Sequence, residues 1–90
     1  MSAARLRFPA GHPAFPGHFP GAPVVPGALL LGAALEALDL GGAGTRIATA
    51  KFLYPVAPEE EIDVHRVGPR LELRVAGRLV VLAMLAGAGA

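Results

Sequence analysis

The stretch GHFPGAPVVPGALLLGAALEAL, residues 17–38, decides how the rest of the chain folds. Its first half is rich in glycine and proline, which exclude regular structure, whereas its second half is almost wholly apolar. Pro26 suits the first turn of a helix, and a glycine pair after the apolar run provides a stop, so we expect a helix over 28–40. Because Glu36 and Asp39 are the charged residues of this run, we expect protein to surround the helix on most sides.

The rest of the chain has the pattern of an antiparallel sheet. After residue 60, apolar and polar residues alternate with a period of two, and Gly-Pro and Ala-Gly pairs mark the turns. Five segments have the composition of strands: 5–8, 45–54, 61–65, 71–75 and 78–85. We therefore predict one α+β domain over residues 1–90, in which an antiparallel sheet wraps around a central helix. The loop over 9–27 contains Phe15 and Phe19 and is expected to pack on the core.

Composition and charge exclude several classes of protein. Eight basic and seven acidic residues give a net charge of +1, so no basic patch favours nucleic acid or an anionic membrane as partner. The chain has no cysteine, and its three histidines lack a carboxylate cluster at ligand spacing, so we expect no metal. No apolar stretch reaches the roughly 20 residues of a membrane span, and we expect a cytoplasmic protein. A hydrophobic content of 53% in 90 residues predicts at least a dimer.

Three segments resemble one family. GHFPGAPVVPGALLL, residues 17–31, is similar to the signature loop and helix start of the hot-dog-fold 3-hydroxyacyl-(acyl carrier protein) dehydratases of fatty acid synthesis. AKFLYPVAPEEEIDV, residues 50–64, resembles that family's next strand and proline-flanked turn, and VAGRLVVLAML, residues 75–85, its closing strand pair. The resemblance implies the hot-dog fold, a homodimer or higher homo-oligomer with an acyl tunnel at its interface, and an acyl carrier protein as partner. It implies no cofactor.

The resemblance also implies roles for particular residues. The family's histidine, which takes the C2 proton of the thioester, falls on His18, and the backbone N–H that holds the thioester oxygen falls on Gly27. The physical chemistry agrees, because imidazole titrates near neutral pH and a helix N-terminus presents free N–H groups. Phe19, beside the histidine, is expected to line the substrate site.

The acid that protonates the departing hydroxyl is missing from its place. In the family pattern it belongs at position 32, which is glycine in this chain. Glu36 lies one helical turn further on the same face, about 6 Å along the axis, and could replace it as catalytic acid. The alternative for Glu36 is a solvated residue, or one paired with Arg46 or Lys51.

These residues leave three functions open. The first is a 3-hydroxyacyl thioester dehydratase with His18 as base, impaired if nothing replaces the acid absent at Gly32. The second is a non-catalytic acyl-thioester-binding protein or a partner subunit of an active homologue. The third is a hot-dog thioesterase, because one fold hosts several reactions.

Overall fold

The computed structural model describes residues 2–9, 24–40 and 44–87 of the chain. Within them lie five strands and one helix: β1 (Ser2–Leu6), α1 (Gly27–Ala37), β2 (Thr45–Phe52), β3 (Ile62–Val67), β4 (Arg70–Val75) and β5 (Arg78–Gly87). All strand pairs are antiparallel, and their order across the sheet is β1-β3-β4-β5-β2. The predicted α+β class is therefore confirmed.

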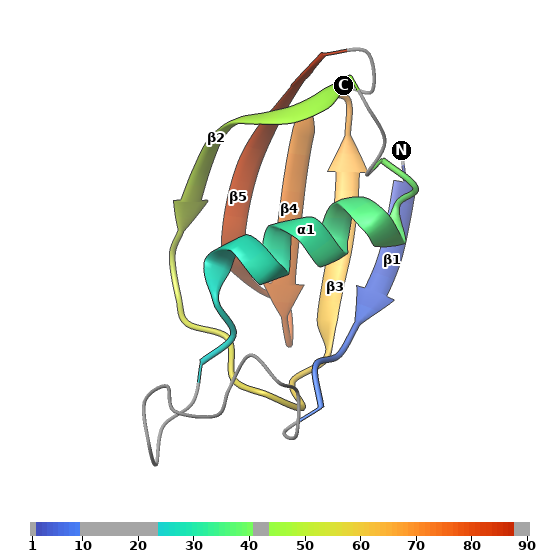
Figure 1. Ribbon diagram of the computed structural model, residues 1–90. Helices are drawn as coiled ribbons and strands as arrows, with labels where there is room; N and C mark the ends of the chain where they lie inside the picture. Colours follow the sequence, from blue (N-terminus) through green and yellow to red (C-terminus); the bar gives the residue numbers. More distant parts are fainter. Residues whose placement is uncertain (1, 10–23, 41–43, 88–90) are drawn as a thin grey trace.

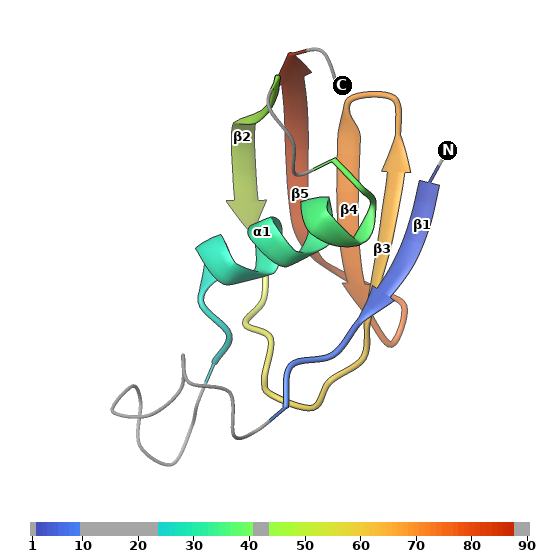
Figure 2. The same ribbon diagram turned by 45° about the vertical axis from the view of Figure 1, so that its right-hand side comes forward.

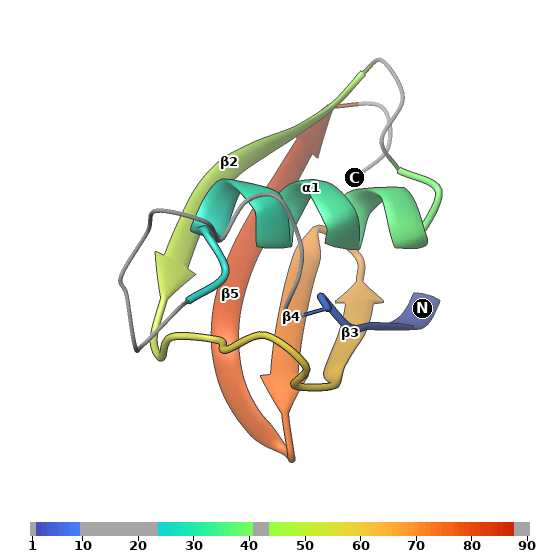
Figure 3. The ribbon, with the colours of Figure 1, turned by 60° about the horizontal axis from the view of Figure 1, so that its bottom comes forward.

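The helix crosses the concave face of the curved sheet. Figures 1 and 2 show α1 running from the β2 side of the sheet, where it begins, to the β1 side, where it ends. Figure 3 shows that the long strands β2 and β5, which pair with each other, are curved. Because β2 and β1 are the two edge strands, the two ends of the helix lie near opposite edges of the sheet.

The core lies between one face of the helix and the concave face of the sheet. The helix contributes Leu30, Leu31 and Ala34, which are all buried. The sheet and its connections contribute the other buried apolar residues: Phe8, Val25, Val56, Ile62, Val64, Leu71, Leu73, Val80, Val81, Ala83 and Leu85. The alternation predicted for β3 and β4 is thus confirmed, with Ile62 and Val64 facing inward.

The opposite face of the helix differs from the prediction. Ala28, Gly32 and Glu36, spaced four residues apart and therefore on one face, are all exposed. The expectation that protein surrounds the helix on most sides is wrong for the single chain, because one five-stranded sheet covers one face of a helix. The exposed face consists of small residues with a single carboxylate.

The helix also ends earlier than its apolar pattern predicts. Asp39 has φ 60°, its N–H donates to the carbonyl of Glu36, and the N–H of Leu40 donates to the carbonyl of Leu35. This is the Schellman arrangement, in which a residue in the left-handed region closes the helix by bonding its last carbonyls. Aspartate tolerates that conformation better than most residues, so the chain turns before it reaches the glycine pair.

The strand boundaries differ by a few residues from those expected. The first strand covers Ser2–Leu6 instead of 5–8, and Phe8, which follows it, is buried in the core. A charge pair joins this edge strand to β3, since Arg5 Nε lies 3.0 Å from Asp63 Oδ1. Just beyond the ends of the two strands, Arg7 Nη2 lies 3.8 Å from Glu61 Oε2. The β2 strand stops at Phe52, two residues before the expected end.

Candidate functional site

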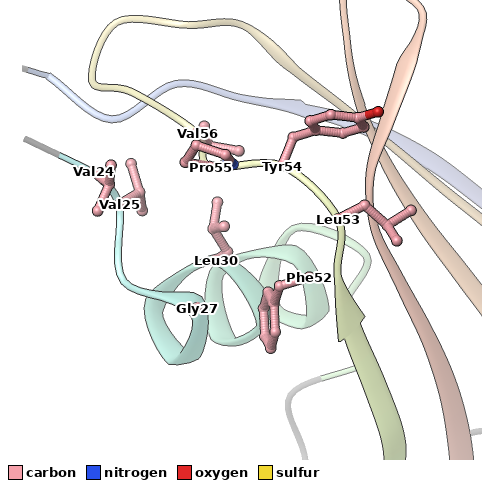
Figure 4. A pocket seen from close by; sticks show the side chains of 9 residues that line it. All are labelled: Val24, Val25, Gly27, Leu30, Phe52, Leu53, Tyr54, Pro55 and Val56. Carbon is pink, nitrogen blue, oxygen red and sulfur yellow. The ribbon is translucent and has the colours of Figure 1, made fainter.

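A cleft of about 410 Å³ opens where the helix begins. It lies between the first turns of α1, the residues that lead into the helix, and the segment that follows β2. Figure 4 shows its lining: Val24, Val25, Gly27, Leu30, Phe52, Leu53, Tyr54, Pro55 and Val56. The cleft is at the small end of the range typical of small-molecule sites.

The two walls of the cleft are held together by the backbone. The N–H of Val25 donates to the carbonyl of Val56 over 2.7 Å, which fixes the residues before the helix against the segment after β2. Both residues are buried, whereas Leu30 points from the helix toward Pro55 and Val56 (Figure 4). The floor of the cleft is therefore part of the hydrophobic core.

The lining is apolar and carries little chemistry of its own. Apart from the phenol of Tyr54, none of the nine described lining side chains is polar or ionisable. Such a surface suits a hydrocarbon chain, because binding of the chain is favoured mainly by the removal of apolar area from water. Any acid or base that acts here must come from elsewhere in the chain or from a partner.

Gly27, the first residue of α1, lines the cleft at the start of the helix. The first bond inside the helix runs from the N–H of Leu30 to the carbonyl of Pro26, over 3.1 Å. The N–H groups of Gly27, Ala28 and Leu29 therefore precede the intrahelical ladder, and no described side chain caps them. Free amides at the positive end of a helix dipole favour an oxygen that carries or develops negative charge.

Gly27 is in close contact with an aromatic ring. A Cβ built at this position would lie 2.7 Å from Cε1 and 2.8 Å from Cζ of Phe52, distances at which one of the two residues must move. The absence of a side chain thus lets the ring approach the first amide of the helix. Phe52 is nonetheless 52% exposed, so its other face is not packed.

The residues predicted for catalysis fall in different places. His18 and Phe19 lie outside the described residues. Gly27 lines the cleft, and its role at the thioester oxygen stays a prediction. Glu36 lies nine residues further along α1, about 14 Å along the helix axis from Gly27, and it is exposed.

The neighbourhood of Gly32 is open. A Cβ built there has nothing within 4 Å, so the first atom of a side chain at this position would meet no described neighbour. Glu36 forms no ion pair with Arg46 or Lys51, and among the described residues no partner is seen for its carboxylate. The role of Glu36 as catalytic acid stays a prediction.

Two aromatic features of the site were not predicted. The contact between Phe52 and Gly27 joins residues 25 positions apart, and the pattern of either segment gives no sign of it. In addition, the guanidinium of Arg78 stacks 4.1 Å from the centre of the Tyr54 ring, beside a second hollow of about 300 Å³ that shares Tyr54 and Pro55 with the cleft.

Among the described residues, the group with a shifted pKa is Glu72, which lies on β4, away from the cleft. The hydrogen bond from Arg74 to the Glu72 carboxylate, 3.0 Å, is the main cause that lowers the pKa of Glu72, and Arg70, 2.7 Å away, adds to it. These groups form a cation–anion–cation row along one strand. Their pairing stabilises the sheet and is separate from the helix start.

No metal ligand set is seen in the described parts of the chain, where no three His, Asp or Glu side chains gather. In the same residues no helix is long and apolar enough to cross a membrane. The prediction of a site without cofactor stays a prediction.

Comparison with known proteins gives the same family as the sequence motifs. The model of the ApeI-like family, described as ApeI dehydratase, matches residues 2–74. A 3-hydroxyacyl-(acyl-carrier-protein) dehydratase FabZ from Novosphingobium aromaticivorans is 41% identical over 64 residues, which are 57% of this chain and 40% of that protein. The FabZ proteins of Bartonella quintana and Bartonella henselae are each 38% identical over 65 residues, 59% of this chain and 42% of theirs. The chain thus spans about two fifths of the length of these relatives.

Proposed function

This chain belongs to the ApeI-like dehydratase family, with the hot-dog fold, and from this premise we propose that it removes water from 3-hydroxyacyl thioesters carried by an acyl carrier protein. The product is the 2-enoyl thioester. The observation that carries the proposal is the first turn of α1, which no described side chain caps, at an apolar cleft. One feature would bind the hydrocarbon chain and the other the thioester oxygen.

The proposed reaction begins with removal of a proton. His18 takes the C2 proton of the thioester, and the electron pair that remains spreads onto the thioester oxygen. The N–H of Gly27 donates a hydrogen bond to that oxygen, where negative charge develops. Collapse of the enolate breaks the bond between C3 and its hydroxyl oxygen, which leaves as water after accepting a proton.

The proposed mechanism needs a proton donor for the departing hydroxyl. The family's position for the acid is Gly32, which offers none. Glu36 is the acidic residue of α1. It lies one turn further from the helix start than Gly32 does, so its side chain must lean back toward the N-terminus to act. Loss of a general acid typically costs 10²- to 10⁴-fold in rate, so the proposed enzyme is slow unless Glu36 or a partner supplies the proton.

A homodimer is part of the proposal. The β2 strand pairs with β5 along one side and is an edge of the sheet, and the residues from Ala48 to Pro55 are all exposed. Unpaired N–H and C=O groups on such an edge are a template for a second strand. Pairing of two β2 edges would also cover apolar side chains that the single chain exposes, among them Phe52, Leu53 and Tyr54.

The test is dehydration of a 3-hydroxyacyl thioester by the purified chain. We expect slow formation of the enoyl thioester, and its loss in His18→Ala, because apart from the Tyr54 phenol no described side chain that lines the cleft is ionisable. His65→Ala is the matched control, since His65 lies on β3. Normal turnover by His18→Ala would refute the proposed mechanism.

Gly32 favours a second candidate function, an acyl-thioester-binding subunit without catalysis. Such a protein keeps the cleft and the amides of α1 but needs no acid. It predicts that the chain binds an acyl carrier thioester and that prolonged incubation yields neither enoyl product nor free thiol. Appearance of enoyl product with the chain alone would exclude this function, and free thiol would indicate a thioesterase.

A further inference from the structure

The second hollow, of about 300 Å³, adjoins the cleft at Tyr54 and Pro55. It lies between the segment after β2, the loop before β3 and the turn from β4 to β5, and its other lining residues are Glu60, Val75, Ala76, Arg78 and Val80. Figure 4 shows the Tyr54 side chain turned away from Leu30, so the segment at Tyr54 separates the two spaces. Unlike the cleft, the hollow has charged side chains in its lining.

Arg78 is the cation of this hollow, and an aromatic ring orients it. Its guanidinium lies 4.1 Å from the centre of the Tyr54 ring. The backbone before that ring is fixed to β5, since the N–H of Leu53 donates to the carbonyl of Val80 over 2.8 Å. A guanidinium that stacks on a ring keeps its N–H groups available, because they point outward in its own plane. The stacking therefore holds a positive charge in place without using its hydrogen-bond donors.

The acidic residue of the hollow does not neutralise this charge. Oε1 of Glu60 accepts a hydrogen bond from the N–H of Ala57 over 2.8 Å, which holds the carboxylate on its own turn. None of the ion pairs among the described residues includes Arg78. Because a planar guanidinium fork matches two oxygens of a phosphate, the hollow offers donors for such an anion.

We propose that the hollow binds the phosphate of the pantetheine arm that carries the acyl group, and that Arg78 donates hydrogen bonds to it. This inference rests on the proposed function, because it assumes that the cleft takes an acyl thioester linked to a carrier protein. The phosphate joins the arm to the carrier, so that end of the ligand must leave the cleft. An arm that leaves past Tyr54 and Pro55 brings its phosphate to Arg78.

The experiment compares two ligands that differ in the phosphate. One is hexanoyl pantetheine with a methylene group in place of the thioester sulfur, which keeps the carbonyl oxygen and cannot be hydrolysed. The other is the same compound with a 4′-phosphate methyl ester, which has the single charge of the arm on its carrier. Both are titrated into the full chain by calorimetry at about 0.15 M salt, where distant surface charges are screened. The measured quantity is the ratio of the two affinities.

In the wild-type chain we expect the phosphate to raise affinity about tenfold, as charge-assisted hydrogen bonds typically do. Arg78→Gln should reduce the ratio to about one and leave affinity for the compound without phosphate unchanged. Arg78→Lys keeps the charge but not the fork, so it should retain part of the ratio. Arg5→Gln is the matched control, because it removes the same charge from β1, outside both hollows.

A second pair of variants tests the ring. Tyr54→Phe keeps the surface on which the guanidinium stacks and should keep the ratio, whereas Tyr54→Leu removes it and should lower the ratio. Tyr54 also lines the cleft, but a change there affects both ligands equally and cancels in the ratio. Thermal melting of each variant is measured alongside, and the Lys and Phe variants keep the test decisive if Arg78→Gln or Tyr54→Leu does not fold.

The outcomes separate this inference from the proposed function. If the wild-type chain binds neither compound, the proposed acyl site is refuted and this inference with it. If it binds both equally, or if Arg78→Gln keeps the ratio of the wild type, the phosphate site is refuted and the proposed function still stands. A fall in affinity of Arg78→Gln for the intact acyl carrier protein, with an unchanged ratio for the small ligands, would refute the phosphate site and indicate contact with the carrier's own surface.

Discussion

Replacing Gly32 with glutamate puts a carboxyl group where the dehydratase pattern has its helix acid. A Cβ at position 32 meets nothing within 4 Å and the position is exposed, so the substitution introduces no clash at Cβ. Residue 32 lies five residues after Gly27, about 7.5 Å along the axis, and a side chain there leans back toward the free amides. The new carboxyl group therefore lies about one turn closer to the helix start than that of Glu36.

The expected effect on activity is large. If the missing proton donor limits the reaction, Gly32→Glu should raise the rate of dehydration about 10²- to 10⁴-fold, the usual contribution of a general acid. The assay is the ultraviolet absorbance of the enoyl thioester formed by the purified chain from a 3-hydroxyacyl thioester. Measuring the rate across pH adds a second signature, because the acid must be protonated to act.

Two control variants separate catalysis from helix stability. Glycine inside a helix costs about 1 kcal/mol relative to alanine, so Gly32→Ala should raise the melting temperature by about 4–8 °C with little change in rate. Gly32→Gln has the shape of the glutamate variant but cannot donate an acidic proton. A Gly32→Glu variant that is no faster than Gly32→Gln would refute the view that the absent acid limits this protein, and a marked loss of stability would refute the open space around Gly32.

Two further predictions concern stability and assembly. Arg74 and Arg70 lower the pKa of Glu72 from its ordinary value of 4.5. The ionised carboxylate therefore stabilises the fold fully above that value, and this stabilisation disappears as the pH falls through the lowered folded-state pKa. Melting temperatures of wild type and Glu72→Gln should differ near neutral pH and converge in acid, and a constant difference would contradict this. If two β2 edges pair, Ala50→Lys should shift the mass measured by light scattering from dimer toward monomer, because it adds charge beside Lys51 on an exposed edge. The control Val67→Lys, on the interior strand β3, should leave the mass unchanged. An unchanged dimer in Ala50→Lys would place the interface elsewhere.

The sequence by itself determined the class of fold, the order of its elements and the family. Each of these depends on short-range spacing: a Pro-Gly helix start, an apolar run too long for a strand, and a period of two in the segments that became β3 and β4. The motif around His18 and the place of Gly27 at the helix start were likewise predicted from neighbouring residues. The predicted ends of the helix and strands were less accurate. At the helix, for example, the Schellman closure at Asp39 depends on a backbone conformation that aspartate adopts only in some contexts.

The tertiary structure decided how distant residues meet. The sheet order β1-β3-β4-β5-β2 places the strand after the helix at an edge, beside the last strand of the chain, and so brings Phe52 against Gly27. It also leaves the face with Ala28, Gly32 and Glu36 exposed, which the apolar composition of the helix did not indicate. The physical reason is that local spacing fixes which face of an element is apolar, whereas the packing of separate elements fixes how much of that face one chain can cover.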